Sequence, residues 1–287
     1  MNQLTVTSRL VCWWTIFRIA LEERLAYRGD FALGTLMRFL PIVTQIFLWW
    51  AIFESINGRL AGYSFPDMVA YYLLSMLGRA FSSMPGLAST VAKQIRDGEI
   101  KKFLVQPIDL VGFFLLGRIA HKLAYYTIST LPFALVFYLC RGYFTNGWPA
   151  AEVMVAFVVS LLLSFMLGFF MDLCIGLVGF WFLEVSSLLF IYMLFNFFLS
   201  GHMFPLDLLP DSISLMYLNT EINVQSTVNC LPFKYLAYVP AAIFLGKIPH
   251  DDLWLELGTG ILWLIALVAL ARFLYLRGLR RYSGYGG

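Results

Sequence analysis

Long apolar runs dominate the hydrophobic pattern of this chain, and short polar stretches separate them. The runs lack the strict alternation of half-buried strands, and they exceed the roughly ten residues of a membrane β-strand. A helix that crosses a bilayer needs about 20 mostly apolar residues. The runs that meet this criterion are residues 31–53, 67–88, 123–140, 152–171, 185–203 and 253–275. The pattern therefore predicts an all-α, polytopic membrane protein with six transmembrane helices.

The residues before the first run predict an interfacial helix. Trp14 and Phe17 share one helical stripe with Leu10 and Leu21, whereas the charged side chains lie mostly off it. An extra short span is the alternative, but its charges would be costly at the bilayer centre. The N-terminal residues show no small-residue cleavage signature, so we expect no cleaved signal peptide. The charges in question are Arg9, Arg18, Glu22, Glu23 and the exception Arg24.

A second irregular region follows the fifth run. Its apolar piece, Tyr235 to Leu245, is too short to cross a bilayer, and Pro232 and Pro240 interrupt it. Non-helical backbone at membrane depth must be covered by protein or face water. We therefore expect residues 204–250 to form a re-entrant hairpin that packs on the helices; a plain surface loop is the alternative.

Composition agrees with a membrane protein. The chain has 60% hydrophobic and 13% charged residues, whereas a soluble domain is about half apolar and a quarter charged. The net charge of +3 is too small and too dispersed to indicate a nucleic-acid partner. The four cysteines are too far apart to predict a zinc site or a redox pair, and we expect no metal and no cofactor.

Positive charge is distributed unevenly between the two predicted sides of the membrane, and the positive-inside rule places the richer side in the cytoplasm. Both termini and the region from Lys93 to Lys122 are thus expected to be cytoplasmic. The richer side carries Arg9, Arg18, Arg24, Arg28, Lys93, Arg96, Lys101, Lys102, Arg118, Lys122, Arg272, Arg277, Arg280 and Arg281; the other carries Arg59, Arg141, Lys234 and Lys247.

A few ionisable residues lie inside or beside the predicted spans. Arg79 is close to the middle of the second run, so we expect an interior partner or a wet cavity there and mark it as a possible intramembrane polar site. Arg38 lies near enough to the cytoplasmic end to snorkel. Asp172 and Glu184 bracket the turn between the fourth and fifth spans, where they can anchor at the interface or pair with basic residues.

Two motifs resemble a known family. Residues 94–109 read QIRDGEIKKFLVQPID, and residues 199–206 read LSGHMFPL, followed by LPF at 231–233. Within six spans, their order resembles that of ATP-binding-cassette (ABC) type-2 permeases. The resemblance implies the membrane subunit of an exporter for hydrophobic or amphipathic compounds in the bacterial plasma membrane. Its implied partners are a separate ABC ATPase, a second permease that is identical or paralogous, and the lipid bilayer.

The same resemblance implies a coupling segment at residues 89–109 that contacts the ATPase. Charges on this segment are expected to pair with the ATPase, apolar side chains to anchor the contact, and Gly98 to permit a sharp turn. An ordinary basic loop is the alternative. The residues assigned to coupling are Ile95, Arg96, Asp97, Gly98, Glu99, Ile100, Lys101, Phe103 and Leu104, with Lys102 as a further charge.

The resulting organisation is a single transmembrane domain over residues 1–287. Its expected parts are the cytoplasmic tail and interfacial helix at 1–30, spans one and two at 31–88, the coupling segment at 89–109, spans three to five at 110–203, the outer hairpin at 204–250, span six at 251–276 and a cytoplasmic tail at 277–287.

Catalytic motifs are absent from the sequence. Gly246-Lys247 lacks the remaining residues of a phosphate-binding loop, so we expect no ATPase site in this chain and no enzyme activity of its own. An ion-coupled secondary transporter would need paired intramembrane carboxylates or an inverted repeat, and neither is evident. A non-transporting scaffold or sensor would be expected to carry a sizeable soluble domain.

Overall fold

The computed structural model describes residues 6–26, 28–56, 58–106, 108–145, 147–182, 184–210, 213–215 and 220–282; within these, the side chains of 6–9, 24–26, 28–36, 38–39, 104, 213–215 and 220–222 are not described. The chain divides into two compact units. Unit 1 comprises Met1–Thr44 and Ile100–Arg141, and unit 2 comprises Gln45–Glu99 and Gly142–Gly287.

Unit 1 is built on the pairing of α1 (Val6–Ala26) with α6 (Leu110–Leu139). A Cβ atom at Gly112 would lie 3.1 Å from the ring of Trp13, so the glycine leaves room for the indole. Unit 1 also holds the first part of α2 (Arg28–Ile56) and the short α5 (Lys101–Val105). Leu10 and Trp14 of the apolar stripe of α1 are each 64% exposed, whereas Phe17 and Leu21 are half-buried; the interfacial placement of this helix stays a prediction.

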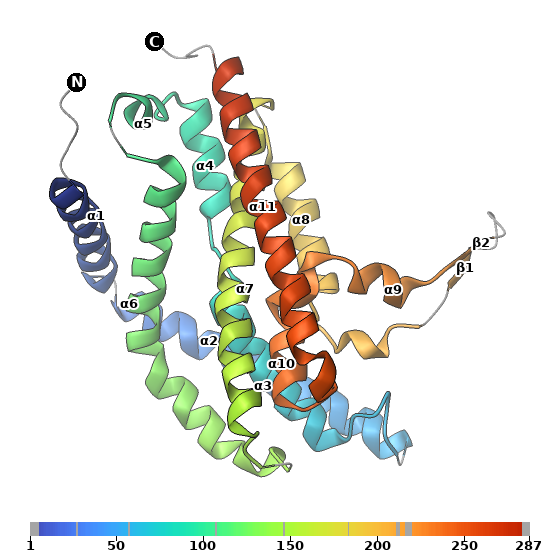
Figure 1. The fold of residues 1–287 in the computed structure, drawn as a ribbon. Helices are drawn as coiled ribbons and strands as arrows, with labels where there is room; N and C mark the ends of the chain where they lie inside the picture. Colours follow the sequence, from blue (N-terminus) through green and yellow to red (C-terminus); the bar gives the residue numbers. More distant parts are fainter. Residues whose placement is uncertain are drawn as a thin grey trace. The chain divides into compact units, whose positions relative to one another are not determined.

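Unit 2 is organised around α7 (Ala151–Leu177). The helices α3 (Phe65–Ser82), α4 (Leu87–Arg96), α10 (Tyr238–Phe244) and α11 (Leu253–Arg281) all pack on it, and Figure 1 shows α7 running alongside α11. Short 3-10 turns at Val178–Phe180 and Pro232–Leu236 complete its surroundings. The core of the unit therefore lies along a single helix.

Small residues let these helices approach closely. A Cβ atom at Gly168 would lie 2.1 Å from the carbonyl oxygen of Ser82, and one at Gly176 would lie 2.8 Å from that of Ala88. Apolar surface gives little net drive for association in lipid, so close backbone packing of this kind is a main source of helix–helix stability there.

The predicted second run is broken in two. α3 ends at Ser82 and α4 begins at Leu87, with Gly86 between them at φ +72°. Pro85 disfavours helical geometry at the preceding residue, and Gly86 takes the left-handed conformation that other residues avoid. The single continuous helix expected over 67–88 is thus wrong at this point.

Each predicted apolar run is largely helical, although the run 67–88 is divided between α3 and α4 and the run 185–203 outlasts the helix Ser186–Leu199. Only some of these helices satisfy a strict test of length and apolarity. Among the described residues, Ala151–Phe180 and His250–Arg281 are long and apolar enough to cross a membrane, while Leu40–Ile56 and Ser186–Leu199 are shorter apolar helices. The last of these is α8, of which no residue is buried; Phe190, for example, is 57% exposed. The six-span arrangement itself stays a prediction.

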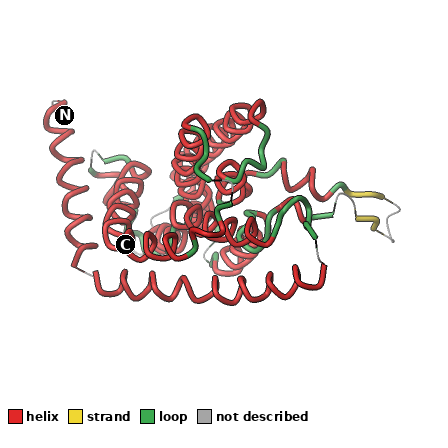
Figure 2. Tube along the Cα trace, turned by 90° about the horizontal axis from the view of Figure 1, so that it is seen from below, coloured by secondary structure: helices red, strands yellow, loops and turns green. Residues whose placement is uncertain are grey.

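The described parts of the region 204–250 pack on other helices of unit 2, whereas the re-entrant path of this hairpin in the membrane stays a prediction. Both α10 and the turn Pro232–Leu236 contact α7, and α10 also contacts α3. The all-α prediction misses two short strands, β1 (Ile213–Leu215) and β2 (Thr220–Ile222), which pair antiparallel with Ser214 opposite Glu221. Figure 1 and Figure 2 show these strands beyond α9 (Val224–Asn229), away from the helices of the unit.

Candidate functional site

The coupling segment folds as two helices joined by a tight turn. α4 runs to Arg96, and the amides of Asp97 and Gly98 donate to the carbonyls of Lys93 (2.8 Å) and Ile95 (3.3 Å). Gly98 has φ +76°, a left-handed conformation that favours glycine, and it forms the sharp turn that was predicted there. α5 then begins at Lys101.

The apolar side chains of this segment are buried within the chain. Ile95 is 4% exposed, Ile100 1% and Phe103 6%. The Phe103 ring lies 5.1 Å from that of Phe113 and 6.1 Å from that of Phe114, measured between centroids. These three side chains are therefore packed inside the chain in this structure, and their role as an anchor for an ATPase stays a prediction. The side chain of Leu104 lies outside the described part.

The charged side chains of the segment are exposed instead. Arg96 Nε lies 3.3 Å from Asp97 Oδ1, and both side chains remain open to solvent. Lys102 lies over the Phe103 ring at 5.2 Å. Val105 is 86% exposed and is an apolar residue that a partner can reach. The accessible charges are Lys93, Arg96, Asp97, Glu99, Lys101 and Lys102.

A second group of polar contacts lies around the N-terminal end of α3, the end away from α4. We call it the polar clasp, and its residues are Gly62, Tyr63, Asp67, Asp207, Tyr238 and Lys247. Two tyrosines converge on one carboxylate here. The hydroxyl of Tyr63 donates to Asp207 Oδ2 at 2.7 Å, and that of Tyr238 donates to Asp207 Oδ1 at 2.6 Å. Burial, followed by the charge of Asp207, raises the pKa of Tyr63, so this phenol stays a neutral donor.

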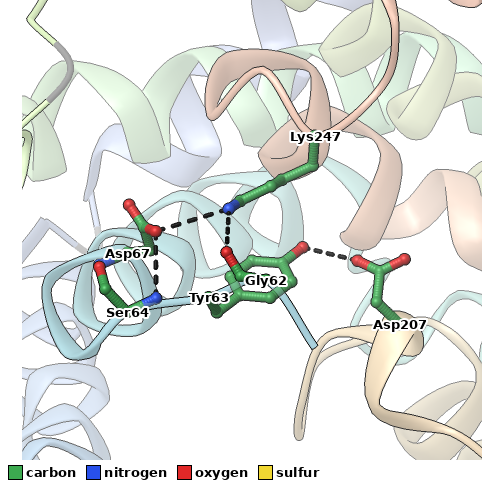
Figure 3. A network of polar contacts seen from close by, with 6 residues as sticks. All are labelled: Gly62, Tyr63, Ser64, Asp67, Asp207 and Lys247. Carbon is green, nitrogen blue, oxygen red and sulfur yellow. Dashed lines mark hydrogen bonds and ion pairs between the residues drawn. The ribbon is translucent and has the colours of Figure 1, made fainter. Parts of the chain in front are cut away.

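Lys247 forms the other half of the clasp, as Figure 3 shows. Its Nζ donates to the carbonyl of Gly62 at 2.9 Å, lies 3.5 Å from Asp67 Oδ2 and sits 4.3 Å from the Tyr63 ring centroid. Asp67 also accepts the backbone N–H of Ser64 at 3.1 Å and so caps α3. One lysine thereby meets a carboxylate, a carbonyl and an aromatic face.

Two further tyrosines of α3 extend the contacts of the clasp. The hydroxyl of Tyr71 donates to the carbonyl of Gly201 at 2.6 Å, and that of Tyr72 donates to the carbonyl of Met203. Gly201 has φ +82°, which favours glycine. α3 therefore holds the chain that leaves α8 by two hydrogen bonds from consecutive tyrosines.

Arg79 occupies an unusual place on α3. It is the one exposed residue of this 18-residue helix, and it lies in the last turn, just before the break. A cation there is favourable for the carboxyl end of the helix dipole. The choice between an interior partner and a wet cavity stays a prediction.

The predicted interface acids have local partners. Asp172 accepts the hydroxyl of Tyr192 at 2.8 Å. Glu184 accepts the amide of Ser186 at 3.1 Å. The side-chain and backbone hydrogen bonds from Ser186, and to a smaller extent the charge of Arg96, lower the pKa of Glu184. Whether Glu184 anchors at the interface or pairs with a basic residue stays a prediction. The side chain of Arg38 lies outside the described residues.

One buried ion pair escaped the sequence analysis. Lys234 Nζ lies 2.7 Å from Glu256 Oε1, with side-chain exposures of 11% and 22%. Nearby, Ser164 donates to the carbonyl of Leu236 at 3.0 Å. The signal was an acid in the first turn of the last apolar run, because an isolated carboxylate there needs a partner.

These features define a class: a helical membrane protein with an exposed charged segment at residues 93–102 and, within unit 2, a polar clasp between α3 and the region 204–250. The sequence model of the family described as ABC-2 family transporter protein matches residues 39–286. The chain belongs to this family and is a membrane permease component of an ABC transporter. A comparison with curated proteins finds no match.

Proposed function

We propose that the chain is the membrane-spanning subunit of an ABC exporter that moves a hydrophobic or amphipathic compound outward. The energy comes from ATP hydrolysed by a separate ATPase, and a second permease, identical or paralogous, completes the path. The family match over residues 39–286 carries this proposal. An ion-coupled transporter or a scaffold has no comparable support.

The ATPase contact is assigned to the exposed charges of the coupling segment. Side chains of both signs lie along α4, the Gly98 turn and α5, so they can pair with complementary charges and set the register of a partner. The buried Ile95, Ile100 and Phe103 give the segment its shape. Apolar contact with the partner falls to Val105, which is 86% exposed.

The orientation follows from the distribution of Lys and Arg. The termini and the coupling segment face the cytoplasm of a bacterial cell, and the hairpin with its polar clasp faces outward. Positive charge in α4, α5 and the end of α11 supports this orientation.

The test is recovery of the ATPase with the purified permease. Reversing Lys93, Arg96 and Lys101 to Glu is expected to lower the recovered ATPase at least about tenfold, because each pair is worth up to about 1 kcal/mol and reversal adds repulsion. The native chain must co-purify with an ATPase whose hydrolysis of ATP is measurable. Failure of the native chain to do so would overturn the proposed function.

The matched control changes the same number of charges elsewhere on the cytoplasmic side. Arg277→Glu, Arg280→Glu and Arg281→Glu, near the end of α11, are expected to leave ATPase recovery within about twofold, since an exposed charge without a partner contributes little. Equal losses in both triple variants would show that the coupling segment is not the contact. Both variants must elute as folded protein.

A further inference from the structure

We propose that the polar clasp joins the outer hairpin to α3, so that the hairpin and the coupling end of α4 move as one body. Asp207 and Lys247 are then positioning residues for transport: they carry a displacement of α4 at the ATPase to the far side of the protein. The proposal rests on the proposed function for the ATPase contact, whereas the clasp itself is visible in the structure (Figure 3).

α3 and the residues leading into it hold the hairpin and the chain before it at several separate points. Tyr71 and Tyr72 hold the chain at Gly201 and Met203, while Tyr63 holds Asp207. Asp67 holds Lys247, which lies 180 residues away in the sequence. Contacts at both the beginning and the end of the hairpin prevent it from tilting about a single attachment.

The side chains of the clasp are largely shielded from solvent. Tyr63 and Tyr71 are fully buried, and the side chains of Asp67 and Lys247 are 11% and 22% exposed. Hydrogen bonds and ion pairs are stronger at low dielectric, and breaking one would leave a buried polar group unpaired. By contrast, the Arg18–Glu22 pair of α1 is 68% and 62% exposed and so contributes little.

The break between α3 and α4 is held in place by packing against α7. Ser82 and Met84 are buried, and the carbonyl of Ser82 sits against Gly168 of α7 so closely that a Cβ atom there would clash. Beyond the break, α4 lies against Gly176 of α7 and against Gly179 of the 3-10 turn that follows it. Since α10 also packs on α7, the hairpin, α3 and α4 all rest on the same helix.

The experiment measures the distance between the two ends of this body. Spin labels are placed at Ser89→Cys on α4 and at the native Cys230 of the hairpin, both exposed, after replacing Cys12, Cys140 and Cys174 with Ala. In the complex with its ATPase, the native clasp is expected to give one distance that is the same without nucleotide and after trapping with ATP and vanadate. A distance that changes between these states would overturn the proposal.

The clasp is then opened with conservative variants. Tyr63→Phe with Tyr238→Phe removes both donors to Asp207 but keeps the rings. We expect the distance distribution to widen at least about twofold, because loss of a hydrogen bond to a charged group shifts a local opening equilibrium by about tenfold or more. ATPase recovery should stay within about twofold. A distribution as narrow as in the native protein would show that the clasp does not hold the hairpin.

Trp254→Phe is the matched control. The native Trp254 Nε1 donates to Glu152 Oε1 at 2.9 Å, and the variant removes this donor but keeps an aromatic ring. The lost hydrogen bond connects α11 to α7 and involves no residue of the clasp. The distance distribution of this variant should match the native one, and widening would contradict a specific role for the clasp. If no ATPase is recovered at all, the proposed function fails, while the same labels in the permease alone still report whether the clasp holds.

Discussion

Gly201 shows how much of the clasp depends on one residue without a side chain. Its backbone is left-handed at φ +82°, and a Cβ atom there would lie 2.6 Å from the Tyr71 hydroxyl and 2.7 Å from the Tyr238 Cβ. The position therefore needs glycine for two independent reasons: the conformation and the space. Both tyrosines take part in contacts that hold the hairpin.

The variant Gly201→Ala is expected to destabilise the protein by more than conformation alone explains. Left-handed strain amounts to about 1–2 kcal/mol for alanine, and overpacking adds about 1–3 kcal/mol. Gly246→Ala isolates the first effect, because Gly246 has φ +65° and nothing within 4 Å of its Cβ position. Thermal unfolding in detergent should rank native, then Gly246→Ala, then Gly201→Ala. Equal midpoints for the two variants would contradict this geometry.

At the scale of elements, the face of α7 that meets α3 and α4 is the main packing surface of unit 2. Gly168 and Gly176 allow backbone contact there, and Ser82 and Ala88 are the small residues opposite. This surface supports α3 and α4, which together connect the clasp to the coupling segment. Its loss would separate α3 from the helix on which α10 also rests.

Gly168→Ala is therefore expected to destabilise the protein by about 1–3 kcal/mol, since the new methyl group would meet the Ser82 carbonyl and backbone cannot move aside easily. Gly258→Ala in α11 is the control: nothing lies within 4 Å of its Cβ position, and alanine favours the helix by up to about 1 kcal/mol. Resistance to denaturation in detergent should fall for the first variant and hold or rise for the second. If resistance to denaturation fell for Gly258→Ala but not for Gly168→Ala, the close packing assigned to Gly168 would be contradicted.

Helix positions were predictable from the sequence because apolar runs of sufficient length have few alternatives in a membrane. The break at Ser83–Gly86 was missed, although Pro85 and Gly86 carried the signal, because apolarity continues through it. The strands β1 and β2 were missed because each has only three residues. Local chemistry thus predicts long elements better than their interruptions.

The candidate site was predictable only where its residues are adjacent in the sequence. The Gly98 turn and the charges beside it could be identified directly. The packing of the apolar residues between them could not be predicted, since a sequence does not say whether Phe103 faces a partner or its own neighbour Phe113. The clasp could not be found at all, because Tyr63 and Asp207 are 144 residues apart and only the fold brings them together.

At the scale of the whole molecule, the orientation is open to a direct test by cysteine accessibility. With the native cysteines replaced, Gly58→Cys and Gln225→Cys are expected to react with an impermeant maleimide added to intact cells, whereas Lys93→Cys should react only after the membrane is opened. Positive charge concentrated near Lys93 is the reason, because it resists translocation. Labelling of Lys93→Cys in intact cells would reverse the assignment of sides.

The division into units also has a consequence for synthesis. Unit 2 is interrupted by the second stretch of unit 1, so Asp67 leaves the ribosome 180 residues before Lys247. At about 5–20 residues per second, that delay is roughly 10 to 35 s. During this interval α3 holds a carboxylate and several tyrosines whose partners do not yet exist. The clasp can therefore close only once α10 and the residues after it have been synthesised.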